Sequence, residues 1–181
     1  MKELALHILD IAQNSIRAEA TVIEITIREQ IKKDLMIIEI KDNGRGMNLE
    51  TLQKVEDPFF TTRNTRKVGL GISLLKAAAL QCEGDFKIQS NEGKGTTLTA
   101  SFKHSHIDRV PLGYIEDTLI TLLMIDKEID YIYTHYYNNN KFYLNTKEIK
   151  KILQELPITD ISVIDWLKEH IKNGIMNIIN T

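Results

Sequence analysis

The sequence predicts a two-layer α+β fold followed by a small α+β C-terminal appendage. The first observation is that segments with the 3.6-residue period of an amphipathic helix are separated by segments in which apolar and polar residues alternate, as in strands. The second is the distribution of glycine: seven of the nine glycines lie between Gly44 and Gly95, and only Gly113 and Gly174 follow. We therefore predict a main domain over residues 1–104 and an appendage over 105–181.

The main domain begins with a helix and a strand pair. Residues 3–17 are predicted to be helical because their apolar side chains share one stripe, formed by Leu4, Ile8, Ile11 and Ala12. Residues 21–29 and 35–40 alternate apolar and polar positions and are rich in β-branched residues, which predicts two strands joined by a polar turn. Asn48 can then cap a short helix over residues 49–55.

The second part of the main domain repeats this order. A helix is predicted from Leu70 to Gln81, ending near Gly84. Residues 85–91 and 96–103 then form a hairpin around the turn Glu92-Gly93-Lys94-Gly95.

The appendage is predicted to contain a helix over 114–126, a hairpin over 129–137 and 142–144, and two helices on either side of Pro157. Its hairpin is rich in tyrosine and phenylalanine. Such residues can form a docking surface, but they more often form an ordinary half-buried sheet, which we favour.

Composition excludes several classes of protein. The chain has 181 residues, a hydrophobic fraction of 43% and a formal net charge of -2, so nucleic acid is not an expected partner, although a local basic patch is compatible with this total. The single cysteine, Cys82, cannot form an internal disulfide. No apolar run approaches the roughly 20 residues that cross a bilayer, and no signal sequence is recognisable. We expect a cytoplasmic protein that does not bind membranes.

Two common phosphate-binding motifs are absent. The segment Gly93-Lys94-Gly95-Thr96 is superficially similar to a P-loop, but Ile88 and Gly95 occupy positions where that motif needs glycine and Ser or Thr. The segment beginning at Gly69 lacks the third glycine of the dinucleotide-binding fingerprint, because Leu74 occupies that position.

Four blocks, in order, resemble the GHKL ATPases, the family of gyrase, the heat-shock chaperone, histidine kinases and the mismatch-repair protein, which share the Bergerat fold. The blocks are Asp10-x-x-x-Asn14, Asp42-x-Gly44-x-Gly46, the segment from Phe59-Phe60 to Gly69-Leu70-Gly71-Ile72, and Gly93-x-Gly95-Thr96-Thr97. The resemblance covers about residues 5–103 and is greatest to the catalytic domain of histidine kinases. It implies a mixed or antiparallel sheet with helices on one face.

The resemblance also implies a Mg-ATP site. It indicates the following nucleotide-binding residues: Asn14, Arg17, Asp42, Gly44, Gly46, Met47, Arg63, Lys67, Gly69, Leu70, Gly71, Thr96 and Thr97. The Asn14 amide oxygen can bind Mg²⁺ beside the phosphates. Asp42 can accept a hydrogen bond from the adenine amine, which guanine lacks at that position, and would select ATP over GTP.

The segment from Asp57 to Leu74 is predicted to be an ATP lid. Its basic residues, which include Arg63 and Lys67, are candidates for contact with phosphates when the lid closes, or are merely solvated. Phe59 and Phe60 are expected to anchor its hinge.

Asp10 determines which reaction the resemblance implies. Hydrolytic family members carry a glutamate at this position, which orients the attacking water, whereas aspartate is one methylene shorter. Arg17 favours the kinase branches, which carry a basic residue there. We expect His7 to be a partly buried or surface helix residue and not a phospho-acceptor. Because the ATPase motif starts within the first ten residues, we also expect the acceptor domain of a histidine kinase to be absent. We expect either phosphoryl transfer to a separate partner protein, or a nucleotide switch or slow ATPase that regulates a partner.

Overall fold

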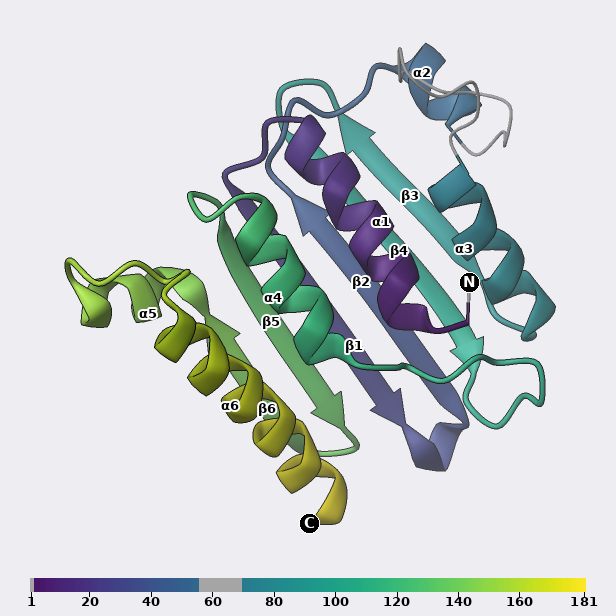
Figure 1. The fold of residues 1–181 in the computed structure, drawn as a ribbon. Helices are drawn as coiled ribbons and strands as arrows, with labels where there is room; N and C mark the ends of the chain where they lie inside the picture. Colours follow the sequence, from purple (N-terminus) through teal and green to yellow (C-terminus); the bar gives the residue numbers. More distant parts are fainter. Residues whose placement is uncertain (1, 56–69) are drawn as a thin grey trace.

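A six-stranded sheet forms the centre of the molecule, with the strand order β3-β4-β2-β1-β5-β6 (Figure 1). The computed structural model describes residues 2–55 and 70–181. The strands are β1 (Val22–Gln30), β2 (Leu35–Asp42), β3 (Phe86–Asn91), β4 (Gly95–Lys103), β5 (Asp130–Tyr137) and β6 (Asn140–Asn145). The sheet is mixed, because β5 pairs in parallel with β1 while the other neighbours pair antiparallel.

Four of the helices form a layer on one face of this sheet (Figure 1). They are α1 (Leu4–Arg17), α3 (Leu70–Gln81), α4 (Ile115–Ile125) and α6 (Ile161–Asn180). Within the layer α1 contacts both α3 and α4, and α4 contacts α6. The remaining helices are the short α2 (Leu49–Lys54), α5 (Thr146–Leu153) and the 3₁₀ helix η1 (Ile31–Lys33). In the described part of the chain, no helix is both long and apolar enough to cross a membrane.

The core lies between the sheet and this helical layer. Alternate residues of the central strands are buried, including Ile23, Ile25 and Ile27 of β1 and Met36 and Ile38 of β2, and their neighbours remain partly exposed on the other face. This alternation is expected for strands that have one covered and one open face. The predicted α+β architecture is therefore confirmed.

The predicted elements are present with small shifts at their ends. Asn48 caps α2 as predicted, since its Oδ1 accepts a hydrogen bond from Thr51 N at 2.9 Å. Strand β2 is longer than predicted and continues to Asp42, because Asp42 pairs with Ile23 of β1 and Thr96 of β4. Strand β6 begins earlier, at Asn140, since Asn138 adopts a left-handed φ of 52° that shortens the turn.

The C-terminal region extends the sheet of the main domain. Strand β5 pairs with β1 in register from Val22 and Asp130 to Glu29 and Tyr137, and β6 pairs with β5. Buried residues from both regions form one continuous apolar cluster. The pairing of β1 with β5 therefore joins residues 105–181, which we expected as an appendage, to the same two layers; the domain division near residue 104 stays a prediction.

Candidate functional site

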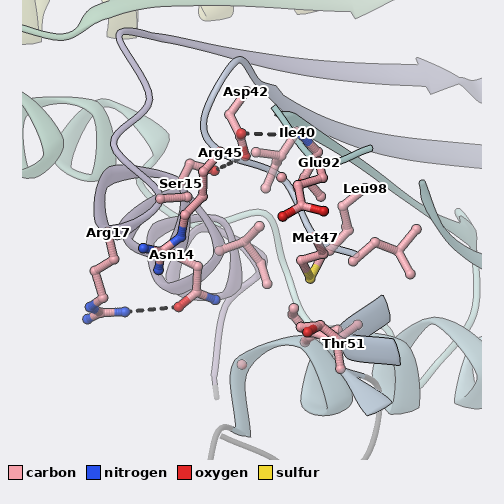
Figure 2. A pocket seen from close by; sticks show the side chains of 18 of the residues that line it. Asn14, Ser15, Arg17, Ile40, Asp42, Arg45, Met47, Thr51, Glu92 and Leu98 are labelled. Atoms are coloured by element: carbon pink, nitrogen blue, oxygen red, sulfur yellow. Dashed lines mark hydrogen bonds between the residues drawn. The ribbon is translucent and has the colours of Figure 1, made fainter. Parts of the chain in front are cut away.

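A pocket of about 390 Å³ opens at one end of the helical layer. Figure 2 shows side chains from several elements pointing into it. The pocket is lined by residues of the C-terminal half of α1, the end of β2 and the loop after it, α2, the start of α3, and the β3–β4 hairpin. The predicted residues that line it are Asn14, Arg17, Asp42, Gly46, Met47, Gly71 and Thr96. Each of the four sequence blocks thus contributes at least one residue to this pocket.

Asp42 is held at the end of β2 by three hydrogen bonds. Its Oδ1 accepts from Gly44 N at 2.9 Å and from Thr96 N at 3.3 Å, and its Oδ2 accepts from the Ser15 hydroxyl at 2.6 Å. The side chain is only 9% exposed. A carboxylate has about four lone-pair positions, so it can accept from one further donor in the pocket. The arrangement therefore presents a fixed hydrogen-bond acceptor to a bound molecule.

The glycine-containing loop after Asp42 packs closely against its surroundings. A Cβ at Gly44 would lie 2.6 Å from the carbonyl oxygen of Ala18, at the end of α1. Gly46 has a φ of +66°, and a Cβ there would overlap the carbonyl of Asn91. Both positions therefore require glycine because the loop backbone approaches α1 and β3 closely.

Ser90 joins this loop to the β3–β4 hairpin. Its hydroxyl accepts a hydrogen bond from Met47 N at 2.8 Å, donates to Gly95 O at 3.0 Å, and lies 2.9 Å from the Thr96 hydroxyl. The amide of Gly93 donates to Arg45 O at 2.7 Å. These contacts fix the two loops relative to each other, and so fix one wall of the pocket.

Asn14 and Arg17 lie together, away from Asp42 (Figure 2). The Arg17 guanidinium donates to Asn14 Oδ1 at 2.9 Å, as expected for residues three apart on a helix. Asn14 lines the pocket, and an amide oxygen is a suitable ligand for Mg²⁺, which prefers hard oxygen ligands and usually binds through few protein groups together with phosphates. Among the described residues, no group of three or more His, Cys, Asp or Glu side chains could hold a metal ion without such help.

Asp10 lies beside the start of α3. A Cβ at Gly71 would overlap the Asp10 carboxylate, so the two residues are in close contact across the α1–α3 interface. Among the residues that the structure describes, those lining the pocket do not include Asp10. Its carboxylate is therefore directed at the first turn of α3 in this conformation.

Other predicted residues have different positions. Thr97 faces away from the pocket, because neighbouring strand residues alternate and Thr96 is the one opposite Asp42. Leu70 begins α3 and is 46% exposed. Arg63, Lys67 and Gly69, and the hinge residues Phe59 and Phe60, lie outside the described residues.

The histidines are not in the pocket. His7 is buried in α1, its Nδ1 has no hydrogen-bond partner, and burial lowers its pKa. His104 and His135 each contact Glu29, through Nε2 atoms that lie 2.8 Å and 2.9 Å from its two carboxylate oxygens. They belong to a buried cluster far along β1 from Asp42.

Sequence reasoning missed Ser15, Ser90 and Glu92. Ser15 directly follows Asn14, and its position on the sheet side of the α1 stripe was a usable signal for contact with β2. Ser90 could not be found without the β3–β4 register, which places it opposite Thr96. Glu92 lines the pocket from the β3–β4 turn, and Figure 2 shows its carboxylate directed inward.

Comparisons with known proteins agree with this geometry. The family model of the histidine kinase-, DNA gyrase B- and HSP90-like ATPases matches residues 2–106. A putative sensor protein from Shewanella frigidimarina is 36% identical over 103 residues, which is 56% of this chain and 16% of that protein. The signal transduction histidine-protein kinase AtoS of Escherichia coli is 35% identical over 100 residues, again 16% of its own length.

Solved structures give a likeness of fold that extends further along the chain. The N-terminal domain of a DNA repair protein has a TM-score of 0.57 and 16% sequence identity, and the alignment covers 87% of this chain and 59% of that one. At this identity the likeness concerns the fold alone. Because it covers more of the chain than the family model does, it includes part of the region beyond residue 106.

Proposed function

The chain belongs to the histidine kinase-, DNA gyrase B- and HSP90-like ATPases, and from this premise we propose that it binds Mg-ATP and transfers the γ-phosphoryl group to a separate partner protein. ATP binding follows from the family. The proposal adds three points to this. It names the residues that bind the nucleotide, it takes Mg²⁺ as the metal ion, and it takes a separate protein as the acceptor of the phosphoryl group.

The observation that best supports the nucleotide assignment is the burial and hydrogen bonding of the Asp42 carboxylate. Its carboxylate is buried, is fixed by Ser15, Gly44 and Thr96, and retains capacity for one more donor. The exocyclic amine of adenine is such a donor, whereas guanine has a carbonyl at the same position. We propose that Asp42 binds the adenine amine and gives preference for ATP over GTP.

The phosphates would then lie toward Asn14 and Arg17. The Asn14 amide oxygen would hold Mg²⁺, which neutralises phosphate charge and polarises the γ-phosphoryl group. The Arg17 guanidinium donates to this same oxygen at 2.9 Å, so it would have to move from Oδ1 toward the phosphates when the ion binds. An uncharged amide ligand avoids placing a carboxylate beside the triphosphate.

Two observations favour transfer to a partner over hydrolysis by the protein alone. Arg17 occupies the position at which the kinase branches carry a basic residue. A group that activates water must be within hydrogen-bond reach of the nucleophile. The Asp10 carboxylate instead lies against Gly71 and is not among the described residues that line the pocket, so its position does not favour hydrolysis.

The test is incubation of the purified protein with γ-³²P-ATP, Mg²⁺ and candidate partners encoded by neighbouring genes. The proposal expects the label on a protein, with D42N and N14A variants as controls that lose it. Release of free phosphate alone, with no labelled protein, would contradict the transfer step.

A second candidate is an ATP-dependent switch or slow ATPase that recruits or releases a partner without phosphorylating it. The contact between Asp10 and Gly71 also favours this function, because it joins α1 to the C-terminal part of the predicted lid segment, at the start of α3. Pull-downs with Mg-ATP, Mg-ADP and no nucleotide distinguish the candidates. Nucleotide-dependent association without a phosphoprotein would support the switch.

A further inference from the structure

Helix α1 connects the pocket to the C-terminal region. Its C-terminal half carries Asn14, Ser15 and Arg17, which line the pocket. Its first turn contacts the segment 111–118, which lies beyond the part of the chain that the family model matches. One end of α1 therefore lies at the pocket, and the other end contacts the C-terminal region.

The segment 111–118 supplies the N-terminal cap of α1. Helices begin with backbone N–H groups that have no partner within the helix. The N-cap residue Glu3 makes no capping hydrogen bond with its side chain, and the first turn has no acidic residue. Instead, Leu4 N donates to Pro111 O at 3.0 Å, and Ala5 N donates to Leu112 O at 2.8 Å.

Thr118 of α4 also hydrogen-bonds to the first turn of α1. Its hydroxyl donates to Ala5 O at 3.1 Å, and the side chain is only 4% exposed. Because the donor is buried, loss of this bond is not compensated by water as it would be at the surface. Gly113 lies so close to Glu3 that a Cβ there would overlap the Glu3 carboxylate.

Packing makes the contact rigid as well as specific. Leu4 and Ile8 of α1 share the core with Ile115, Leu119 and Leu122 of α4, and each of these is at most 2% exposed. Helix α1 has 14 residues, so it is about 20 Å long at 1.5 Å per residue. A small tilt at its first turn becomes a displacement at Asn14 and Ser15, near the other end.

We propose that the segment 111–118 is a positioning element for the ATP site and that Thr118 acts through α1. It sets where the Asn14 amide and the Ser15 hydroxyl lie relative to Asp42. The inference rests on the proposed nucleotide site, and it assigns a role in that site to residues outside the family match. A partner that bound the C-terminal region could change ATP affinity by this route.

The test compares Thr118→Val, which removes the hydroxyl at nearly constant shape, with Thr118→Ser, which retains it. The matched control is Thr121→Val on the same helix, because the Thr121 hydroxyl bonds to Asp117 O of its own helix and is exposed. Isothermal titration with Mg-ATP measures the affinity, and circular dichroism measures folding and Tm. Thr118→Ala removes the hydroxyl in a second way if the valine variant does not fold.

We expect T118V to bind Mg-ATP about three- to tenfold more weakly, the scale of one buried hydrogen bond. T118S and T121V should remain within about twofold of the wild type. If T118V lowers Tm but binds Mg-ATP as the wild type does, Thr118 is only structural and the inference is overturned. If the wild type itself does not bind Mg-ATP, the proposed function fails instead.

Discussion

The Ser15 hydroxyl donates a 2.6 Å hydrogen bond to Oδ2 of Asp42, and the two residues are 4% and 9% exposed. This bond joins α1 to the end of β2. Since Asn14 precedes Ser15, the same turn of α1 that presents the proposed Mg²⁺ ligand also orients the proposed adenine acceptor. The two ends of the nucleotide site are therefore mechanically connected by one helical turn.

Ser15→Ala should weaken ATP binding. The substitution leaves Oδ2 of Asp42 without its donor, so the carboxylate can rotate and its free lone pair is no longer aimed at the pocket. A hydrogen bond to a charged group contributes about 1.5–3 kcal/mol, part of which should appear as lost affinity. Titration with Mg-ATP measures it, and Ser101→Ala, at a hydroxyl that contacts Asp85 instead, is the matched control. Equal affinities for S15A and wild type would contradict the role.

Asp42→Asn should reduce both affinity for ATP and preference over GTP. The single amide oxygen will face the N–H groups of Gly44 and Thr96, so the NH₂ group takes the place of Oδ2 and the adenine amine meets a donor. We expect ATP binding to weaken by about 1.5–3 kcal/mol, while GTP binding changes less. Competition of both nucleotides against a fluorescent ATP analogue measures the two affinities. An unchanged ratio of ATP affinity to GTP affinity would contradict the assignment of Asp42 to the adenine amine.

Local patterns predicted most of the elements but not how they assemble. The helix over Leu4–Arg17 and the alternation along β1 and β2 are periodic signals carried by the residues themselves. The parallel pairing of β1 with β5 joins Ile23 to Tyr131. No local pattern encodes such a long-range pairing, so the C-terminal region was predicted to be an appendage.

The same distinction applies to the site. Asn14 and Asp42 could be named because their spacing to other blocks resembles a family. Thr96 and Thr97 could not be distinguished, since their strand register was unknown, and the pairing of Thr96 with Asp42 separates them. The close contact of Asp10 with Gly71 depends on the packing of α1 on α3, which composition does not specify.

Asn14→Ala should abolish the dependence of ATP binding on Mg²⁺. In the wild type we expect affinity to fall when EDTA removes the ion, because the amide oxygen and the phosphates hold it jointly. In the variant, affinity should be low with or without Mg²⁺. Leu6→Ala, at an exposed position of the same helix outside the pocket lining, is the control. A variant whose affinity still rises on Mg²⁺ addition to the wild-type extent would show that another group binds the ion.

His7 should make stability depend on pH in the neutral range. Burial lowers its pKa below the ordinary value of 6.5, and its Nδ1 has no hydrogen-bond partner. The unfolded chain therefore takes up a proton before the folded protein does as pH falls below 6.5. The free energy of unfolding should then decrease, by up to about 1.4 kcal/mol per pH unit, until the folded protein is also protonated.

Denaturant titrations of His7→Leu between pH 5 and 8 check this expectation. The leucine variant should lack this loss of stability on acidification, whereas the same substitution at the exposed His170 should retain it. Parallel pH profiles for H7L and the wild type would assign the dependence to other groups.

Glu29 should produce a second decrease in the free energy of unfolding, at a more acidic pH than that of His7. Burial alone would raise its pKa, but hydrogen bonds from His135 and His104 outweigh that effect and hold the pKa below the ordinary value of 4.5. The folded protein therefore resists protonation of this carboxylate. Its contribution is present above about pH 4.5 and is lost as pH falls through the lower folded-state pKa.

Glu29→Gln should therefore flatten the acid limb of the stability profile while lowering stability at pH 7 by about 1.5–3 kcal/mol, the worth of hydrogen bonds to a charged group. Because Glu29 lies on β1 and His135 on β5, the loss should also loosen the pairing between the main sheet and the C-terminal region, which amide exchange of Tyr133 and His135 would detect. Glu39→Gln, on the partly exposed face of β2, is the control. An acid limb unchanged in E29Q would mean that the two histidines stabilise the sheet without holding Glu29 ionised.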